Sequence, residues 1–326
     1  MARVGGTEVN VGLGIESTAG TAVAATVFPQ WTEFSLQAIS EKALFNSQRG
    51  VRNMASNSMI RRRYSEGSMS CIANTENAPY LFGLALGSVS SGSITDSAYT
   101  HTITVQNAHA SMKTATVLLE QGGEVTERFA NVVMNSLNFE VSDNYATMTA
   151  EMIGGFPDTG TVTESFTTND EFAYHQMSAK FGTSISNANG NSATPIKSFA
   201  LNINNNVLLD EAFLSGANTP TAGGFIAGRM QITGSYSLQF DGLAELNKYK
   251  ANTLNSMELT FTGSLIGSTS AHQIIFEVAD MVLTAPPKEI SLDGIIILTQ
   301  EFEVSFDATD SELTVKVIND DNGDDY

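Results

Sequence analysis

The chain has 326 residues, 42% of them hydrophobic, which is enough to bury a core in each of two domains and argues against intrinsic disorder. Its 35 acidic residues outnumber 16 basic residues and give a formal net charge of −19, which disfavours a groove for DNA or RNA phosphates and an anionic membrane surface. The one cysteine, Cys71, excludes an internal disulfide framework and a cysteine-based metal cluster within one chain.

The first residues carry no apolar segment of the kind that directs secretion. No stretch approaches 18 consecutive apolar residues, the length that a membrane-spanning helix needs. We therefore expect a protein that is made and folded in the cytoplasm and has no membrane span.

Most of the chain alternates polar and apolar residues with a period of two and is interrupted by Gly, Ser, Asn and Thr. This pattern is typical of β-strands joined by turns, so we predict a mainly β fold. The clearest predicted strands are residues 33–37, 99–105, 114–119, 138–141, 197–203, 229–240, 257–262 and 312–317.

Only two segments carry convincing helical signals. The first is 77–86, with Pro79 in its first turn and Gly87 as a stop after its last. The second begins at Asp241, which can cap a helix, and Asn252 can close it.

Two short motifs recur in the same order along the chain. Gly67-Ser68-Met69-Ser70 matches Gly234-Ser235-Tyr236-Ser237 at an offset of 167 residues, and each motif precedes a predicted helix. Phe139-Glu140-Val141-Ser142 matches Phe302-Glu303-Val304-Ser305 at an offset of 163 residues. Because the two offsets differ by no more than one short loop, we predict an internal duplication of a strand–helix–strand unit.

The boundary between the copies is predicted at the segment 154–160, which is rich in glycine and contains a proline. Copy one then spans residues 1–155 and copy two spans 156–326. The last residues, 319–326, are mostly acidic and are predicted to form a solvated tail.

The sequence carries none of the motifs expected of an enzyme. No nucleophile elbow, P-loop or complete dinucleotide-binding fingerprint occurs. Cys71 corresponds in the repeat to Leu238, which favours a small buried hydrophobe over a nucleophile. The histidines do not share a helical spacing with carboxylates as in a zinc hydrolase; they are His101, His109, His175 and His272. We predict no catalytic residue, no cofactor and no metal site.

One basic cluster lies in the polar segment 46–65. Its members are Arg49, Arg52, Arg61, Arg62 and Arg63. Tyr64 is the only aromatic residue nearby, whereas a nucleic-acid surface would interleave several aromatic residues with the basic ones. The segment is therefore either a solvated loop or a docking arm that contacts carboxylates on a neighbouring subunit.

Several segments together resemble the tail tube proteins, or major tail proteins, of long-tailed bacteriophages. They are the strand and turn from Val11 to Ala25, the next strand from Phe28 to Leu36, the arginine-rich segment, the strand that runs into a helix at 78–87, and the closing strands through Phe139. The resemblance implies a β-sandwich with one flanking helix in each copy, whose inner sheet pairs with its neighbours to close a ring. Such rings stack into a hollow tube in the virion.

The resemblance also implies the partners: other copies of the chain, a tape measure protein, a tail terminator, and DNA that passes through without specific binding. Two tube domains per chain predict a ring of three chains with pseudo-sixfold symmetry, and six chains per ring are the alternative. An acidic inner wall would repel DNA phosphates, so that the genome slides.

Glu140 and Glu303 alternate with apolar residues on the matched strands, so we expect both to face away from the core, toward a lumen or toward solvent. The leading prediction is a structural, non-enzymatic virion protein that forms the conduit for DNA ejection. The alternative is a β-sandwich that serves as a binding or decoration module on a virion surface.

Overall fold

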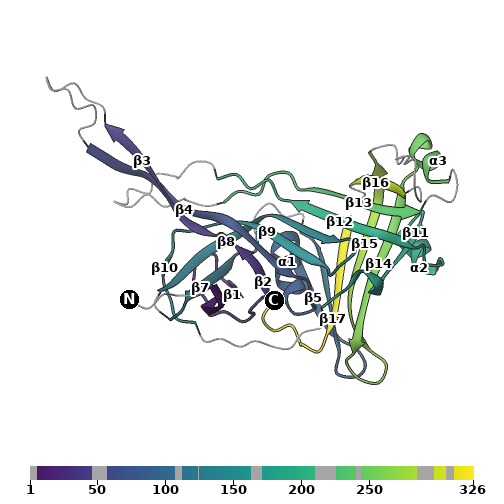
Figure 1. Ribbon diagram of the computed structural model, residues 1–326, viewed down its shortest axis with the longest axis horizontal. Helices are drawn as coiled ribbons and strands as arrows, with labels where there is room; N and C mark the ends of the chain where they lie inside the picture. The colour runs from purple at the N-terminus through teal and green to yellow at the C-terminus, as the bar shows by residue number, and fades with distance from the viewer. Residues whose placement is uncertain are drawn as a thin grey trace.

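The computed structural model describes residues 6–45, 57–106, 112–123, 125–162, 171–209, 225–239, 244–284, 297–305 and 312–326. Across these ranges the chain is mainly β, as predicted, and its strands pair in antiparallel fashion. One β-hairpin projects well beyond the body of the molecule (Figure 1). Within the described ranges, every helix is too short or too polar to cross a membrane.

The strands are β1 Val9–Ile15, β2 Trp31–Phe34, β3 Gln37–Phe45, β4 Asn57–Ile72, β5 Gly87–Ser93, β6 Tyr99–Val105, β7 Ala115–Gln121, β8 Val125–Val141, β9 Thr147–Gly154, β10 Asp158–Thr159, β11 Met177–Gly182, β12 Ile196–Asn204, β13 Gln231–Gln239, β14 Asn255–Leu265, β15 Ala271–Leu283, β16 Ile297–Val304 and β17 Leu313–Asn319. The helices are α1 Asn77–Leu86, α2 Ile185–Gly190 and α3 Ala244–Ala251. Two short 3₁₀ turns are η1 Gly6–Glu8 and η2 Tyr174–Gln176.

Helix α1 forms where the sequence predicts it. It is followed by Gly87, whose φ of 97° lies in the left-handed region that glycine adopts without strain, and the Gly87 N–H donates to the Gly83 carbonyl. Every residue of α1 is buried, because the helix packs against β5, β6 and β8.

The second predicted helix is α3, followed by Asn252 with a positive φ of 49°, whereas its predicted cap, Asp241, lies outside the described residues. The structure adds α2, which the sequence did not predict because that segment has no apolar periodicity. The hydroxyl of Ser184 caps α2 by accepting a hydrogen bond from the Asn187 N–H at 3.2 Å.

The predicted strand 33–37 is interrupted in the structure. Strand β2 ends at Phe34 and β3 begins at Gln37, and the Ser35 N–H donates to the Ser68 carbonyl at 2.8 Å. Both strands pair with β4, so the interruption bends the chain between two sections of the same partner strand.

Two groups of strands cross each other around the core and are joined where β15 pairs with β16, and β1, β7 and β10 form a further sheet with the first part of β8. The central sheet has the strand order β3, β4, β9, β8, β12, β13, β16. The crossing sheet has the order β11, β14, β15, β17, β6, β5. Strands of the central sheet run across Figure 1 while β14, β15 and β17 run nearly vertically, an arrangement typical of orthogonal sheet packing.

The two predicted copies are joined by strand pairing in both sheets. Strand β8 of copy one pairs with β12 of copy two, and β6 of copy one pairs with β17 of copy two. One hydrophobic cluster contains residues of both, and the rings of Phe139 and Phe276 have centroids 4.8 Å apart. Each copy contains a β-hairpin, a helix and a second β-hairpin in that order, namely β3–β4, α1 and β5–β6 in copy one and β12–β13, α3 and β14–β15 in copy two.

Glu16 fixes the turn that follows β1. Its buried carboxylate accepts hydrogen bonds from the backbone N–H of Gly20 at 2.7 Å and of Asn131 at 2.9 Å. The hydroxyls of Thr114 and Thr116 donate to the same carboxylate, each at 2.8 Å. One side chain therefore connects this turn to β7 and β8.

The acidic end of the chain is docked, which corrects the prediction of a solvated tail. The Tyr326 ring packs edge-on against Tyr80 and His101, with centroid distances of 4.8 and 4.7 Å, and its hydroxyl donates to the Asp321 carboxylate at 3.0 Å. Aromatic burial fixes the backbone of this segment. Its exposed carboxylates are Asp320, Asp324 and Asp325.

His101 is buried beneath this segment. Its ring nitrogens lie 2.8 Å from the Ser91 hydroxyl and 2.8 Å from the Asn319 side-chain oxygen. Burial lowers the pKa of His101, although the Asn319 contact and the Asp321 carboxylate oppose that shift.

The lowered pKa of His101 predicts a loss of stability on acidification. As the pH falls below about 6.5, His101 binds a proton in the unfolded chain but stays neutral in the folded chain, so the free energy of unfolding decreases. This decrease ends once the pH is below the lower pKa that His101 has in the folded state. Urea midpoints between pH 8 and 5 should fall less steeply for His101→Gln than for the wild type. The matched control is His175→Gln, at an exposed histidine, which should behave like the wild type. Equal slopes for all three proteins would contradict this assignment.

Candidate functional site

One face of the central sheet is mainly polar, and Tyr64, Val133 and Ile153 form a small buried apolar cluster beside Glu151 on the same side. Strand β16 shows the alternation most clearly, because Leu298 and Phe302 are buried while Glu301 and Glu303 are exposed. Since side chains in a strand alternate between faces, the strand register shows which residues share the exposed one.

Two adjacent rows across the strands define this polar face. The first row is Ser70, Thr149, Asn138, Asn202, Thr233 and Glu303. The second row is Thr147, Glu140, Ala200, Ser235 and Glu301. Over β9, β8, β12, β13 and β16 neither row contains a basic or large apolar side chain, and on β4 the second row ends at the half-buried Ile72. Over these five strands the face combines small neutral groups with carboxylates.

The two carboxylates singled out from the sequence both lie on the polar face. Glu140 on β8 and Glu303 on β16 are exposed, and Glu303 accepts a hydrogen bond from the Gln231 side chain at 3.1 Å. Glu151 on β9 is a further exposed carboxylate of this face, and it accepts from the Ser136 hydroxyl at 2.9 Å. The repeated motif identified Glu140 and Glu303, whereas Glu151 and Glu301 follow from the strand register.

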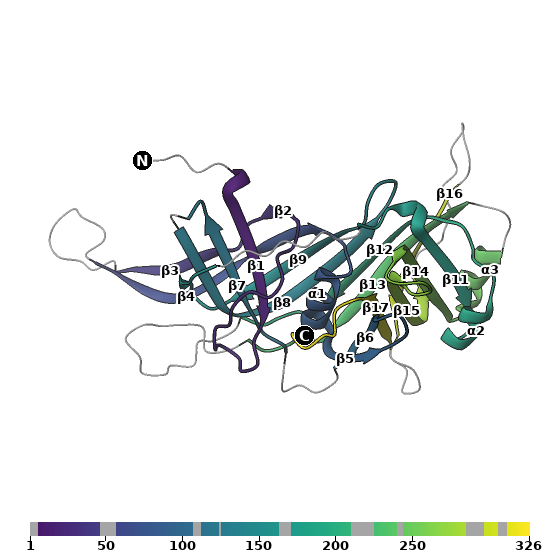
Figure 2. The ribbon, with the colours of Figure 1, turned by 90° about the horizontal axis from the view of Figure 1, so that it is seen from below.

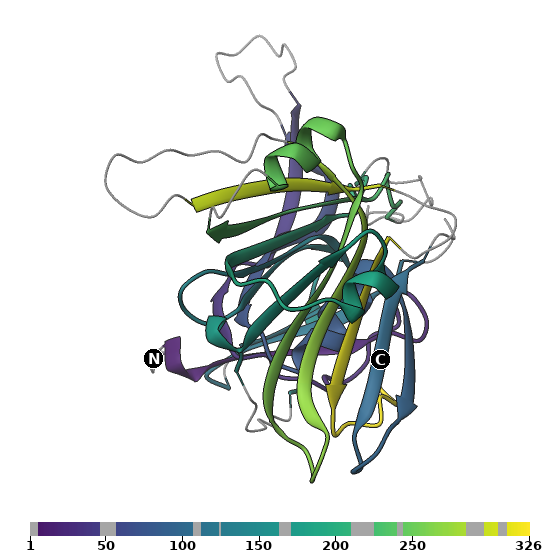
Figure 3. The same cartoon turned by 90° about the vertical axis from the view of Figure 1, so that its right-hand side faces the viewer.

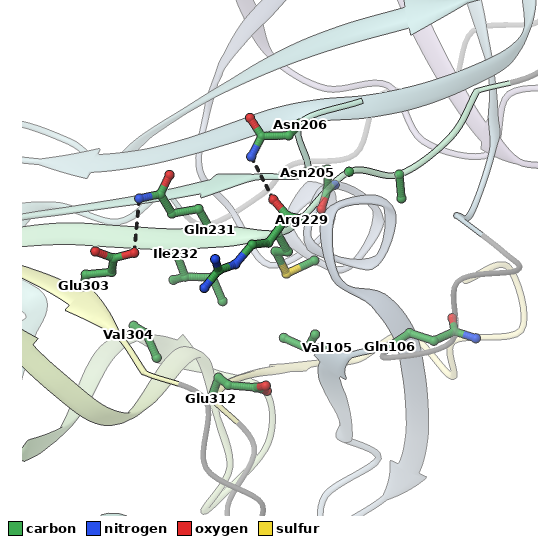
Figure 4. A pocket seen from close by; sticks show the side chains of 13 residues that line it. Val105, Gln106, Asn205, Asn206, Arg229, Gln231, Ile232, Glu303, Val304 and Glu312 are labelled. Atoms are coloured by element: carbon green, nitrogen blue, oxygen red, sulfur yellow. Dashed lines mark hydrogen bonds between the residues drawn. The ribbon is translucent and has the colours of Figure 1, made fainter. Parts of the chain in front are cut away.

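A pocket of about 530 Å³ opens next to this face (Figure 4). The Arg229 side chain points into it between the carboxylates of Glu303 and Glu312. The Asn206 side chain donates to the Arg229 carbonyl at 2.8 Å and holds the chain at the pocket rim. The described lining residues include no serine, cysteine, histidine or lysine, so they offer charge complementarity and no nucleophile. Among the described residues, no group of three His, Cys, Asp or Glu side chains could hold a metal ion.

The β3–β4 hairpin extends beyond the body, and its described residues 37–45 and 57–66 are called the projecting hairpin here (Figure 2). Residues 57–65 are therefore strand, which corrects the interpretation of this stretch as a solvated loop. The run of arginines hides the period-two alternation that would have predicted a strand. Near the end of the hairpin, Leu44 is 65% exposed and Met59 is 52% exposed.

The structure separates the arginines of the basic cluster by their contacts. Arg62 forms an ion pair with Glu41 at 2.5 Å, donates to the Leu209 carbonyl at 2.7 Å, and lowers the pKa of Glu41. The Arg63 guanidinium lies 5.0 Å from the centroid of the Phe156 ring. Arg61, in contrast, is exposed on the hairpin. The remaining two members, Arg49 and Arg52, lie outside the described residues.

A second extended segment accompanies the projecting hairpin, and the sequence analysis missed it. It continues the β12–β13 hairpin, where Leu208 bridges to Ile226, and both side chains are more than half exposed. Its Leu209 carbonyl is the acceptor for Arg62, so this segment contacts the projecting hairpin. Both extended segments belong to hairpins that precede a helix, so the predicted repeat could have indicated the second segment from the first.

A family model described as phage tail tube protein matches residues 6–304, a range that contains the projecting hairpin and the whole polar face. No curated protein gives a significant match to the sequence.

Proposed function

Because the chain belongs to the phage tail tube protein family, we propose that its copies assemble into closed rings that stack into a hollow tube, the conduit for DNA ejection. The chain is in this view a structural component of the virion tail. The observation that carries the proposal is the polar face, a broad sheet surface of small neutral groups and carboxylates, and these carboxylates repel DNA phosphates.

The edges of the central sheet support ring closure. On its outer side β3 has no partner strand among the described residues, and β16 pairs with β15 only through Phe302–Val304. Open edges present unpaired N–H and C=O groups and bind other strands. Pairing of β16 of one chain with β3 of the next would continue the polar face around a channel, with Glu140 and Glu303 on its wall.

The internal repeat supports three chains per ring. Each chain contributes two hairpin–helix–hairpin units, so three chains supply six units with pseudo-sixfold symmetry. Residues 1–155 and 156–326 share one hydrophobic core, so their division into two tube domains is a proposal that rests on the repeat. The family relation extends the proposal to a tape measure protein within the channel and a tail terminator at its end.

Negative-stain electron microscopy of the purified protein at increasing concentration tests the proposal. We expect hollow tubes whose rings show three chains after rotational averaging. Rings of six chains would support the proposed tube but contradict three chains per ring. A monodisperse monomer at every concentration would contradict the tube and favour a binding or decoration module.

The projecting hairpin is the proposed contact between subunits, and Arg61 provides its cleanest test. Arg61→Glu should leave the fold intact and raise the concentration needed for tube assembly by about 10-fold, equivalent to about 1.4 kcal/mol. Sedimentation and electron microscopy measure this, with circular dichroism as the check on folding. The triple replacement of Arg61, Arg62 and Arg63 would in addition break the contacts of Arg62 with Glu41 and Leu209.

The matched control is Lys250→Glu, which makes the same charge change at an exposed position on α3. It should assemble like the wild type. If Arg61→Glu assembles at the same concentration as the wild type, Arg61 takes no part in the subunit contact.

A further inference from the structure

The β3–β4 and β12–β13 hairpins have equivalent registers. Two cross-strand pairs of the first hairpin match two of the second, namely Ile39–Tyr64 with Asn204–Gln231 and Ala43–Met59 with Leu208–Ile226. Positions 39 and 204, and 43 and 208, differ by 165, whereas positions 64 and 231, and 59 and 226, differ by 167. The offset of 167 residues also separates the repeated Gly-Ser motifs. Each residue of one hairpin therefore has a counterpart in the other.

The part of the projecting hairpin around Arg62 and Tyr64 is covered within the chain. Arg62 donates to the Leu209 carbonyl of the second extended segment at 2.7 Å. Val207 and Leu209 of that segment pack against the cluster that contains Tyr64, which is only 7% exposed. This contact closes the junction between the two copies inside one chain.

The corresponding part of copy two is open. The counterparts there are Arg229 and Gln231, which are exposed and line the pocket of about 530 Å³, called the Arg229 pocket here (Figure 4). Glu41, which forms the ion pair with Arg62, has Asn206 as its counterpart. Arg229 therefore lacks the cross-strand ion pair that Arg62 forms.

The projecting hairpin carries the residues that correspond to the covering segment. The counterparts of Val207 and Leu209 are Lys42 and Leu44 on β3. Lys42 is exposed and Leu44 is 65% exposed, and Figure 1 and Figure 3 both show the hairpin leaving the body of its own chain. Because they lie two positions apart on one strand, the two side chains point to the same side. Both are therefore available together to a second copy of the chain.

The differences between the two copies are complementary in charge. Lys42 takes the place of the apolar Val207, and the pocket supplies the carboxylates of Glu303 and Glu312. Glu303 already accepts a hydrogen bond from Gln231 at 3.1 Å, so Glu312 is the carboxylate that suits an incoming ammonium group. A contact that is apolar within the chain thus becomes a charged one where two chains meet.

Building on the proposed ring, we infer that the Arg229 pocket of one chain binds residues 42–44 of the next chain in the same ring. Arg229 donates to the Leu44 carbonyl, which repeats the contact between arginine and carbonyl inside the chain. Lys42 pairs with Glu312, and the Leu44 side chain covers the apolar part of the pocket.

A ring then contains two kinds of junction. The junction inside a chain is apolar and closes when the chain folds, whereas the junction between chains is charged and closes on assembly. The mismatched combination would bury the ammonium group of Lys42 against the apolar cluster of Tyr64, which is unfavourable. Pairing of unlike copies is therefore favoured, and this supports three chains per ring.

Disulfide trapping within assembled rings tests the contact directly. Leu44→Cys/Gln231→Cys joins the two positions that correspond to Leu209 and Tyr64 inside the chain. After oxidation of assembled tubes, a non-reducing gel should show linked chains that end at the three chains of one closed ring. Native Cys71 does not interfere, because it is buried and its thiol pKa is raised to about 12.

The matched control for trapping is Leu44→Cys/Gln239→Cys. It places the second thiol at an exposed glutamine at the other end of β13 and should give no linked chains. Linked products that continue beyond the chains of one ring would show that the contact joins adjacent rings, and this would overturn the inference.

Charge reversal gives an independent readout. Lys42→Glu and Glu312→Lys should each raise the concentration needed for assembly about 10-fold, and their combination should recover most of the loss. The combination of Lys250→Glu with Glu312→Lys has the same net charge without the pairing and should recover nothing. Circular dichroism checks that each variant is folded.

The outcomes separate this inference from the tube itself. Charge variants that assemble at the normal concentration, together with tubes that give no linked chains, would overturn the pocket contact while the tube stands. Failure of the wild type to form any ring or tube would instead overturn the proposed function.

Discussion

Replacement of Glu16 by alanine is expected to lower the free energy of unfolding by about 3–5 kcal/mol. The carboxylate is buried and accepts four hydrogen bonds, two of them from the backbone N–H groups of Gly20 and Asn131. Alanine would leave these partly buried donors without their acceptor, and hydrogen bonds to a charged group are worth more than neutral ones. The hydroxyls of Thr114 and Thr116 can rotate toward other acceptors, but the two N–H groups cannot.

Urea unfolding followed by circular dichroism measures this effect. The protein concentration must stay below that of assembly, because association stabilises the folded chain by mass action. The matched control is Glu33→Ala, which removes an exposed carboxylate from β2 and should change the free energy by less than about 0.5 kcal/mol. Glu16→Gln should also lower the free energy of unfolding, because the NH2 group of its amide would face N–H and O–H groups that need an acceptor. A loss below about 1 kcal/mol in Glu16→Ala would show that the network is not a structural element.

The sequence predicted the elements whose signals are local. Helix α1 was placed correctly because Pro79 and Gly87 mark its first turn and its end. The predicted strands 99–105 and 257–262 correspond to β6 and to part of β14 because their period-two pattern is uninterrupted. The burial of Cys71 followed from its match with Leu238, because both lie on the strand that precedes a helix.

Other features depend on contacts between residues far apart in the chain. Three of the donors to Glu16 lie just before β7, in β7 and in β8, about a hundred positions later, and nothing near Glu16 in the sequence predicts them. The charge of the last residues predicts a solvated tail, yet the partly buried Tyr326 ring packs edge-on against Tyr80. For the polar face, the repeat identified Glu140 and Glu303, but the register from β8 through β12 and β13 to β16 is what places them on one surface.

Reversal of the charge of the polar face is expected to turn a wall that repels DNA into one that binds it. The variant Glu140→Lys/Glu303→Lys should still form tubes, because both side chains are exposed and the hydrogen bond from Gln231 to Glu303 lies at the surface. Each lysine that meets a phosphate releases condensed counterions. Binding of a short DNA duplex to the tubes should therefore appear in the variant and weaken steeply with salt.

Fluorescence anisotropy of a labelled duplex with preassembled tubes measures this change at several salt concentrations. The logarithm of the binding constant should fall with the logarithm of salt by about 0.9 per phosphate contacted. The matched control, Glu127→Lys/Glu171→Lys, makes the same charge change away from the polar face. Stronger DNA retention in the first variant than in the control locates the effect on the channel wall, because net charge is equal in both. Equal retention would mean that the polar face does not line the channel, and the carboxylates of β8 and β16 would then face solvent outside the tube.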